Sequence, residues 1–235
     1  FYNIMNKFVT NSTHFVTETD DKILYPFGPP IFQTEVDSNF TKELLEEGLR
    51  LGNNNKKWDH KHAGDFLVYG KPYQFDDDFI LKSESYLKTF VEKFFNGLYK
   101  QLGEDFIGID SMLLKQHDRR QLKQGNVRLD TMWINFSKKH DFIPPHSHTG
   151  VLSFIIYCKI PKEIFDDNTN GGSQRQAGQI VFDYGEDISM LQRTEFSVKP
   201  YENLMFIFPN KLRHYVPVYF KDAERVSVSG NFVVV

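Results

Sequence analysis

The spacing of the hydrophobic residues changes near residue 126 of the chain. Before that point, apolar side chains recur every three or four residues, which predicts helices. After it, apolar and polar side chains alternate over short stretches bounded by turns, which predicts strands. Several short strands after a helical first half predict a mainly β, α+β fold, an antiparallel sandwich or barrel with helices packed outside it.

Two helices are predicted in the first half. Asp37 or Ser38 can cap the first, because a short polar side chain accepts hydrogen bonds from the free N–H groups of the first turn. The expected buried residues of this helix are Phe40, Leu44, Leu45 and Leu49. The second helix begins near Ser83, and its apolar stripe consists of Leu87, Phe90, Val91, Phe94, Leu98 and Leu102. One apolar stripe is typical of a helix that packs on a core.

Three other segments of the first half lack a helical period. Residues 1–22 are rich in Asn, Thr, Ser and Asp and are expected to form an N-terminal arm. Residues 23–36 contain several Pro and Gly residues, which favours an edge strand because proline cannot donate to a central ladder. Residues 53–78 are polar and irregular, as expected of a surface segment.

The second half contains the predicted strands. Residues 127–136 alternate most clearly, and further candidates lie at residues 151–160, 179–184, 203–208 and 225–235. Between them, residues 166–178 have the Gly, Asn and Ser content of a mobile lid. No long linker divides the chain. Residues 23–235 are therefore expected to form a single domain, with helical support at 38–125 and the β core at 126–235.

Composition narrows the chemistry that the chain can perform. One Cys and eight His mean that a metal site would use imidazole and carboxylate rather than thiolate. A net charge of −3 gives no general nucleic-acid or membrane signature. No apolar run approaches the roughly 20 residues of a membrane span. The first residues lack a secretory pattern, so a cytoplasmic location is expected.

The histidines fall into two groups. One group lies in polar or irregular segments and is expected to be ordinary surface or loop residues: His14, His60, His62, His117 and His140. In the other group, His146 and His148 follow a predicted strand and a Pro-Pro pair. Residues two apart on a strand share a face, so both imidazoles could reach one ion. His214 comes at the end of another buried-looking strand and is a third candidate ligand.

The last predicted strand has a polar face. Arg225, Ser227, Ser229 and Asn231 alternate with apolar residues and are expected to point to the same side. Burying an unpaired guanidinium is costly. Arg225 is therefore expected to meet an anion, either a protein carboxylate or a ligand.

The order of these features resembles that of the Fe(II)/2-oxoglutarate-dependent oxygenases, and most closely the 2OG-Fe(II) oxygenases of phages and marine bacteria. The matching residues, in chain order, are Trp133, Ile134, Asn135, Pro145, His146, Ser147, His148, Leu152, Ser153, Tyr157, Phe208, Pro209, His214, Arg225 and Asn231. The resemblance spans most of the chain and is strongest over residues 131–231. It implies a double-stranded β-helix core, which is a jelly-roll-like, cupin-type fold.

The resemblance also implies roles for particular residues. His146 matches the first iron ligand and His214 the distal one, while Arg225 with Ser227 matches the pair that holds the far carboxylate of 2-oxoglutarate. Two further cosubstrate contacts are expected at Asn135 and Tyr157. The implied activity is that of an Fe(II)- and 2-oxoglutarate-dependent dioxygenase, which uses O2 to hydroxylate its substrate and releases succinate and CO2. No separate catalytic acid or base is expected.

The chain departs from the family pattern at position 148, where His148 replaces the usual acidic ligand. Three alternatives follow: His148 completes a neutral three-His set, water fills the place, or an acid from elsewhere such as Asp183 serves. A three-His set resembles the thiol dioxygenases, which bind iron but no 2-oxoglutarate. The bulk of His148 argues against a halogenase, in which a small residue makes room for chloride.

The expected substrate is an amino-acid side chain, free or peptidyl, or another small molecule, and no membrane partner is expected. Residues 115–139 hold seven basic residues against two acidic ones, which could form a rim for a nucleic-acid substrate. Such a run is more often a solvated face, and the negative net charge favours that interpretation. From another functional class, a non-catalytic jelly-roll binding module remains the alternative.

Overall fold

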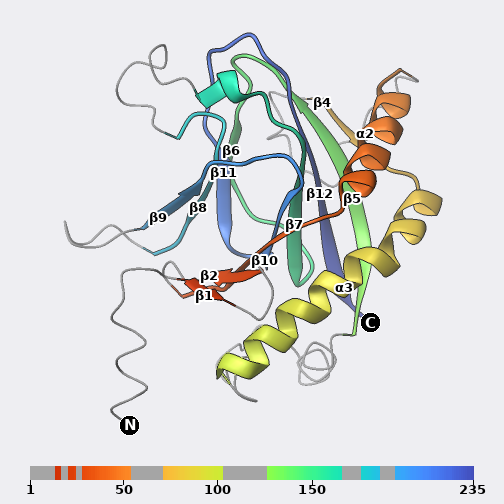
Figure 1. Ribbon diagram of the computed structural model, residues 1–235, viewed down its shortest axis with the longest axis vertical. Helices are drawn as coiled ribbons and strands as arrows, with labels where there is room; N and C mark the ends of the chain where they lie inside the picture. Colours follow the sequence, from red (N-terminus) through yellow and green to blue (C-terminus); the bar gives the residue numbers. More distant parts are fainter. Residues whose placement is uncertain are drawn as a thin grey trace.

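The chain forms two antiparallel β-sheets and two long helices over its described residues (Figure 1). These residues, in a computed structural model, are 14–16, 21–24, 28–53, 71–102, 126–165, 176–185 and 194–235. The helices are α2 (Ser38–Asn53) and α3 (Asp77–Leu102), and a short 3-10 helix, η2, spans Lys162–Phe165.

The two sheets differ in size. The larger has eight strands in the order β1 (His14–Val16), β2 (Lys22–Leu24), β3 (Ile31–Glu35), β10 (Leu204–Pro209), β7 (Leu152–Lys159), β12 (Arg225–Val234), β5 (Val127–Ser137) and β4 (Lys71–Gln74). The smaller has four, in the order β6 (Ile143–His146), β11 (Arg213–Val216), β8 (Ile180–Asp183) and β9 (Glu195–Val198). The mainly β fold with flanking helices is confirmed, and its core is the double-stranded β-helix that the resemblance implies.

Helix α2 begins where the sequence predicts. The Asp37 carboxylate accepts a hydrogen bond from the N–H of Asn39 at 2.7 Å, so Asp37 is the cap. Leu44 is buried as expected, but Leu49 is 48% exposed, and that part of the predicted face is wrong. The helix instead approaches the sheet through Gly48, where an added Cβ would lie 2.3 Å from the side chain of Ile134.

Helix α3 begins six residues before the predicted start, because Asp76 rather than Ser83 caps it. The Asp76 carboxylate accepts a hydrogen bond from the N–H of Phe79 at 3.0 Å. The predicted stripe is otherwise confirmed. Its buried members are Leu87, Phe90, Val91, Phe94 and Leu98.

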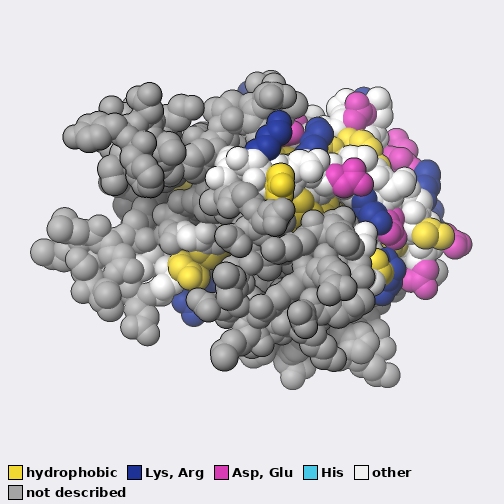
Figure 2. Space-filling view, turned by 90° about the horizontal axis from the view of Figure 1, so that it is seen from below, with side chains coloured by type: hydrophobic (Ala, Val, Ile, Leu, Met, Phe, Trp, Pro, Cys, Tyr) yellow, Lys and Arg dark blue, Asp and Glu magenta, His cyan; other side chains and the backbone are white. Residues whose placement is uncertain are grey.

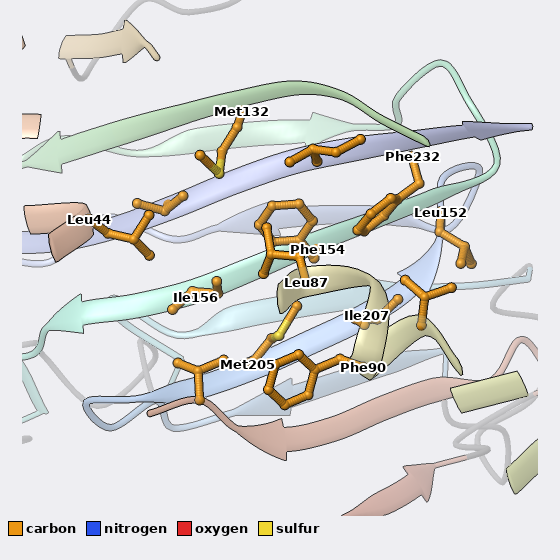
Figure 3. Close-up of a cluster of buried hydrophobic side chains, with 14 of the residues drawn as sticks. Leu44, Leu87, Phe90, Met132, Leu152, Phe154, Ile156, Met205, Ile207 and Phe232 are labelled. Atoms are coloured by element: carbon orange, nitrogen blue, oxygen red, sulfur yellow. The ribbon is translucent and has the colours of Figure 1, made fainter. Parts of the chain in front are cut away.

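The main hydrophobic core lies between these helices and one face of the larger sheet. Figure 3 shows Leu44 of α2 and Leu87 and Phe90 of α3 facing apolar side chains of β5, β7, β10 and β12. From β12 the core takes Val226, Val228 and Phe232. The residues that alternate with them are Arg225, Ser227, Ser229 and Asn231, which therefore point to the opposite face, toward the smaller sheet.

That opposite face carries aligned rows of side chains. Ser227 pairs with Asn135 of β5 on one side and with Tyr157 of β7 on the other. Ser229 pairs in the same way with Trp133 and Ile155. Tyr157 and Ile155 belong to a second buried cluster, which includes Phe182 of β8 and Phe208 of β10. The sequence predicted this polar inward face of β12, and the register confirms it.

The edge-strand prediction for residues 23–36 is wrong. This segment forms β2 and β3, and β3 is hydrogen-bonded to β2 on one side and to β10 on the other. Pro29 and Pro30 precede β3, so they remove no donor from its ladder. Strand β4 lies within the segment that was interpreted as irregular, and the prediction also missed β6, β9 and β11 as separate strands.

Several sequence predictions fall outside the described residues. They concern most of the N-terminal arm, His60, His62 and His117, residues 115–125 of the basic run, and residues 166–175 of the expected lid. On the face in Figure 2, acidic and basic side chains are mixed over the described part, with no single sign gathered there. Neither described helix is long and apolar enough to cross a membrane.

Candidate metal centre

Three imidazoles converge between the two sheets. His146 is the last residue of β6, His148 lies just beyond that strand, and His214 lies on β11, directly across the ladder from His146. One ligand nitrogen from each ring lies within 4.8 Å of the other two. The ring centroids are separated by 4.4, 4.8 and 5.1 Å. Among the described residues, these three form the one group of His, Cys, Asp and Glu side chains that could hold a metal ion.

Backbone carbonyls fix the orientation of two of the rings. Nδ1 of His146 lies 2.8 Å from the carbonyl oxygen of Pro144, and Nδ1 of His214 lies 2.9 Å from that of Leu212. A carbonyl can only accept, so Nδ1 carries the proton in both rings and Nε2 keeps its lone pair. This is the usual preparation of a histidine for metal binding, in which the second nitrogen is held by the protein.

Burial keeps the imidazoles neutral. Desolvation lowers the pKa of His146, lowers that of His148 to about 3, and lowers that of His214 well below its usual value. The mutual repulsion of the rings, once charged, acts in the same direction on His148 and His214. A metal ion therefore competes with no bound proton at neutral pH.

Aromatic side chains surround the cluster. The ring centroids of Trp133 and His148 lie 5.5 Å apart, and those of Phe208 and His214 lie 4.8 Å apart. Phe182 of the smaller sheet also packs near His214, with the two ring centroids 6.2 Å apart. Trp133 and Phe208 are both buried, and both form part of the wall of the cluster. An apolar wall limits the access of water to the donor atoms.

Arg225 is buried without a partner. Its exposed fraction is 0%, and none of its guanidinium nitrogens has a hydrogen-bond partner among the described residues. The hydroxyls of Ser227 and Tyr157 are also buried without one. The guanidinium carbon lies 5.1 Å from the centre of the Tyr157 ring. Unsatisfied buried groups of this kind are costly, and together they offer hydrogen-bond donors to an anion, as a carboxylate requires.

The remaining predicted cosubstrate residues lie beside Arg225. Asn135 and Tyr157 flank Ser227 in one row of the larger sheet, and the next row along β12 contains Trp133. Burial raises the pKa of Tyr157 to about 12, against the opposing effect of the Arg225 cation. Tyr157 therefore keeps its proton and can donate it to an acceptor. These rows lead from Arg225 to Trp133, which forms part of the wall of the histidine cluster.

Asp183 does not join the cluster. In β8 it pairs with Arg213 of β11, while the neighbouring pair is Phe182 with His214. Asp183 and Arg213 therefore point away from His214, and their side chains form an ion pair on the other face of the smaller sheet. The proposal of Asp183 as an acidic ligand is wrong for this physical reason.

The loop that holds His148 is tied to the turn between β10 and β11, which the sequence analysis did not single out. The N–H of His148 donates to the carbonyl of Asn210 at 2.9 Å, and the Asn210 amide donates to the carbonyl of His148 at 2.9 Å. A lone Asn in a Pro-Asn-Lys turn gives no sequence signal for this role. His214 is likewise not at the end of β10, as predicted, but on the separate strand β11.

Fold and site together define a double-stranded β-helix protein with a cluster of three histidines that could hold a metal ion and a buried arginine. Residues 131–231 match the family model described as "Putative 2OG-Fe(II) oxygenase". Over these residues, which make up less than half of the chain, it is similar to the 2OG-Fe(II) oxygenase family, as its sequence indicates. No curated protein sequence matches the chain.

One solved structure with a TM-score of 0.50 supports the fold, and two others are similar at lower scores. A prolyl hydroxylase from Trichoplax adhaerens, in complex with a hypoxia inducible factor oxygen degradation domain peptide fragment, superposes with a TM-score of 0.50 and 13% identity, covering 86% of this chain and 83% of that chain. A Pseudomonas putida prolyl-4-hydroxylase gives a TM-score of 0.49 and 11% identity, covering 87% and 92%. HygX from Streptomyces hygroscopicus, with nickel and 2-oxoglutarate bound, gives 0.47 and 10%, covering 87% and 82%.

Proposed function

We propose that the protein is a dioxygenase that hydroxylates an amino-acid side chain or another small molecule, with release of succinate and CO2. His146, His148 and His214 would hold Fe(II), and Arg225 and Ser227 would hold the far carboxylate of 2-oxoglutarate, with Asn135 and Tyr157 beside them. When bound, Fe(II) with 2-oxoglutarate and O2 supplies the oxidising power for C–H hydroxylation.

The observation that carries this proposal is the unpartnered guanidinium of Arg225. A buried cation without a protein counter-ion is expected where a ligand anion completes the site. The adjacent hydroxyls of Ser227 and Tyr157 lack partners as well, so this group of side chains offers more donors than the described residues provide acceptors for. A dicarboxylate satisfies these groups with one end, and its other end is free to reach the histidines.

The side chains of the chain then have three separate tasks. The imidazoles present neutral lone pairs to a metal ion, and the carbonyls of Pro144 and Leu212 hold two of the rings in place. Trp133 and Phe208 keep bulk water from the reacting atoms. Arg225 binds and orients the cosubstrate. None of these tasks requires a side chain to exchange a proton with the substrate, in keeping with the absence of a separate acid or base from the proposal.

A three-His iron enzyme that does not use 2-oxoglutarate is the second candidate. It is favoured by the chemistry of the donor set, because no described carboxylate joins the three imidazoles. It leaves the Arg225 pocket without a ligand, which is why the first candidate is preferred. Both candidates bind iron, whereas a non-catalytic binding module needs neither iron nor 2-oxoglutarate.

The proposed substrate is a peptidyl side chain or a small molecule. The described members of the basic run, Arg128, Lys138 and Lys139, do not make a continuous basic surface, since Arg128 pairs with Asp130 and Lys138 approaches Glu224. A nucleic-acid substrate is therefore not favoured by the described residues.

An anaerobic thermal-shift experiment with Mn(II), 2-oxoglutarate, or both separates these functions. A ligand that binds only the folded state raises the melting temperature. The proposal expects a rise with Mn(II) and a further rise when 2-oxoglutarate is added. A rise with Mn(II) alone would support the three-His candidate without 2-oxoglutarate. No rise with any addition would contradict both iron enzymes.

A further inference from the structure

The turn between β10 and β11, residues 209–212, contacts two of the three histidines. Its Leu212 carbonyl accepts the Nδ1 proton of His214 at 2.9 Å. Its Asn210 contacts His148 through both backbone and side chain. The turn is itself closed by a hydrogen bond from the N–H of Leu212 to the carbonyl of Pro209 at 2.9 Å. A single rigid turn therefore fixes His148 relative to His214.

His148 needs this support more than the other two histidines. His146 and His214 lie on paired strands, where the ladder sets their positions. His148 lies beyond the end of β6 and has no strand neighbour. Its backbone instead forms two hydrogen bonds with Asn210, one in each direction. The N–H of Asn210 also donates to the carbonyl of Val151 at 3.2 Å, so Asn210 holds the loop at both of its ends.

Asn210 is suited to this task by its burial. It is 5% exposed, so its amide does not exchange partners freely with water. The Lys211 ammonium also approaches the carbonyl of His148, at 3.3 Å, but Lys211 is exposed and its contribution is correspondingly small. The Asn210 amide is thus the buried hydrogen-bond donor of this turn that ties His148 in place.

We propose that Asn210 is a positioning residue that holds His148 as the third metal ligand, so that this site keeps three protein ligands without the usual carboxylate. This inference rests on the proposed metal centre. Outer partners that orient a ligand typically change metal affinity by about 10- to 100-fold when they are removed. The effect of Asn210 must pass through His148 and must vanish when the His148 imidazole is absent.

The test measures Co(II) binding, both as a dissociation constant by calorimetry and as the visible absorption spectrum of the bound ion. Asn210→Ala removes the side-chain hydrogen bond and keeps the backbone one. Asn210→Asp keeps the size of the side chain and removes the donor, so it replaces the Ala variant if that one folds poorly. Thr41→Val is the control, because it removes the part-buried hydrogen bonds that the Thr41 hydroxyl donates to Ser38 and Asn203, on the far side of the larger sheet.

We expect Asn210→Ala and Asn210→Asp to weaken Co(II) binding about tenfold or more and to shift the spectrum toward that of His148→Ala. Thr41→Val should leave both readouts unchanged. In the His148→Ala background, either Asn210 substitution should add no further loss. Wild-type affinity in a folded Asn210 variant, or an equal loss with and without His148, would overturn the positioning role. Failure of wild-type protein to bind Co(II) would instead overturn the metal centre itself.

Discussion

The Nε2 atoms of His148 and His214 lie 3.2 Å apart. The proton of His214 is on Nδ1, so its Nε2 presents a lone pair to the other ring. At this separation His148 satisfies the lone pair by donating a proton, or a cation lies between the two nitrogens. A metal ion bound by both rings would replace this contact. The short distance places the Nε2 of His148 where it can bind the same ion as His214.

Substitution of His148 tests its role as a ligand. We expect His148→Ala to weaken Mn(II) binding by at least about tenfold, because one of three donors is lost. His148→Asp should bind Mn(II) at least as tightly as the wild type, since it restores the two-His, one-carboxylate set that suits Fe(II). Calorimetric titration under anaerobic conditions measures both. If His148→Ala kept wild-type affinity, His148 would not be a ligand.

Replacement of Arg225 by Met should separate stability from cosubstrate binding. Because the guanidinium is buried without a partner, a similar-sized apolar side chain should stabilise the apo protein by about 1 kcal/mol or more. The same substitution should abolish the melting-temperature rise caused by 2-oxoglutarate and spare the rise caused by Mn(II). Chemical denaturation and thermal shift provide the two measurements. An apo protein made less stable, with the 2-oxoglutarate effect intact, would mean that Arg225 serves the fold and not a ligand.

Gly150 gives a second test of the loop that carries His148. Its φ is +97°, and an added Cβ would lie 2.5 Å from the carbonyl oxygen of Phe232. Gly150→Ala should therefore cost about 1–3 kcal/mol of unfolding free energy and displace the loop from β12. We expect Mn(II) affinity to fall as well. Gly52→Ala, at a helical glycine where an added Cβ would make only an ordinary van der Waals contact with Tyr73 at 3.8 Å, is the matched control and should leave metal binding unchanged. Unchanged stability of Gly150→Ala would be inconsistent with this close approach.

Cys158 should react only when the protein unfolds. It packs in the main core on β7, and burial raises the pKa of its thiol to about 12, with the Glu202 carboxylate acting in the same direction. The reactive thiolate is therefore scarce at pH 8. Ellman's reagent should label no thiol in the native protein and one in denaturant, so the labelling rate follows unfolding. Fast labelling of the native protein would show that this part of β7 is open.

Periodicity predicted the elements that bury a whole face. The stripe from Leu87 to Leu98 and the alternation along β12 each involve many side chains packed against one core. Such a pattern can therefore be recognised in the sequence even when a single residue departs from it. The same reasoning failed for β3, where proline residues before the strand were counted as part of it. It also missed β11, which is short and follows β10 after a tight turn.

The candidate site was only partly predictable for a similar reason. Histidine and arginine stand out within predicted apolar strands, so His146, His148, His214 and Arg225 could be singled out from the sequence. The structure brings the three histidines together. Asn210 acts through hydrogen bonds between loops distant in sequence, which no local pattern encodes. The elimination of Asp183 likewise needed the register of β8 against β11, because that register decides which face its side chain takes.

The central claim is that one site binds Fe(II) through the three histidines and 2-oxoglutarate through Arg225 at the same time. Anaerobic visible spectroscopy tests it most directly, because a keto acid chelated to Fe(II) gives a charge-transfer absorption that neither component has alone. We predict that this absorption develops when 2-oxoglutarate is added to the Fe(II)-loaded protein. It should be absent in His214→Ala and require far more 2-oxoglutarate in Arg225→Met. Wild-type protein that binds Fe(II) and 2-oxoglutarate without this absorption, or an unaltered response in Arg225→Met, would contradict the account.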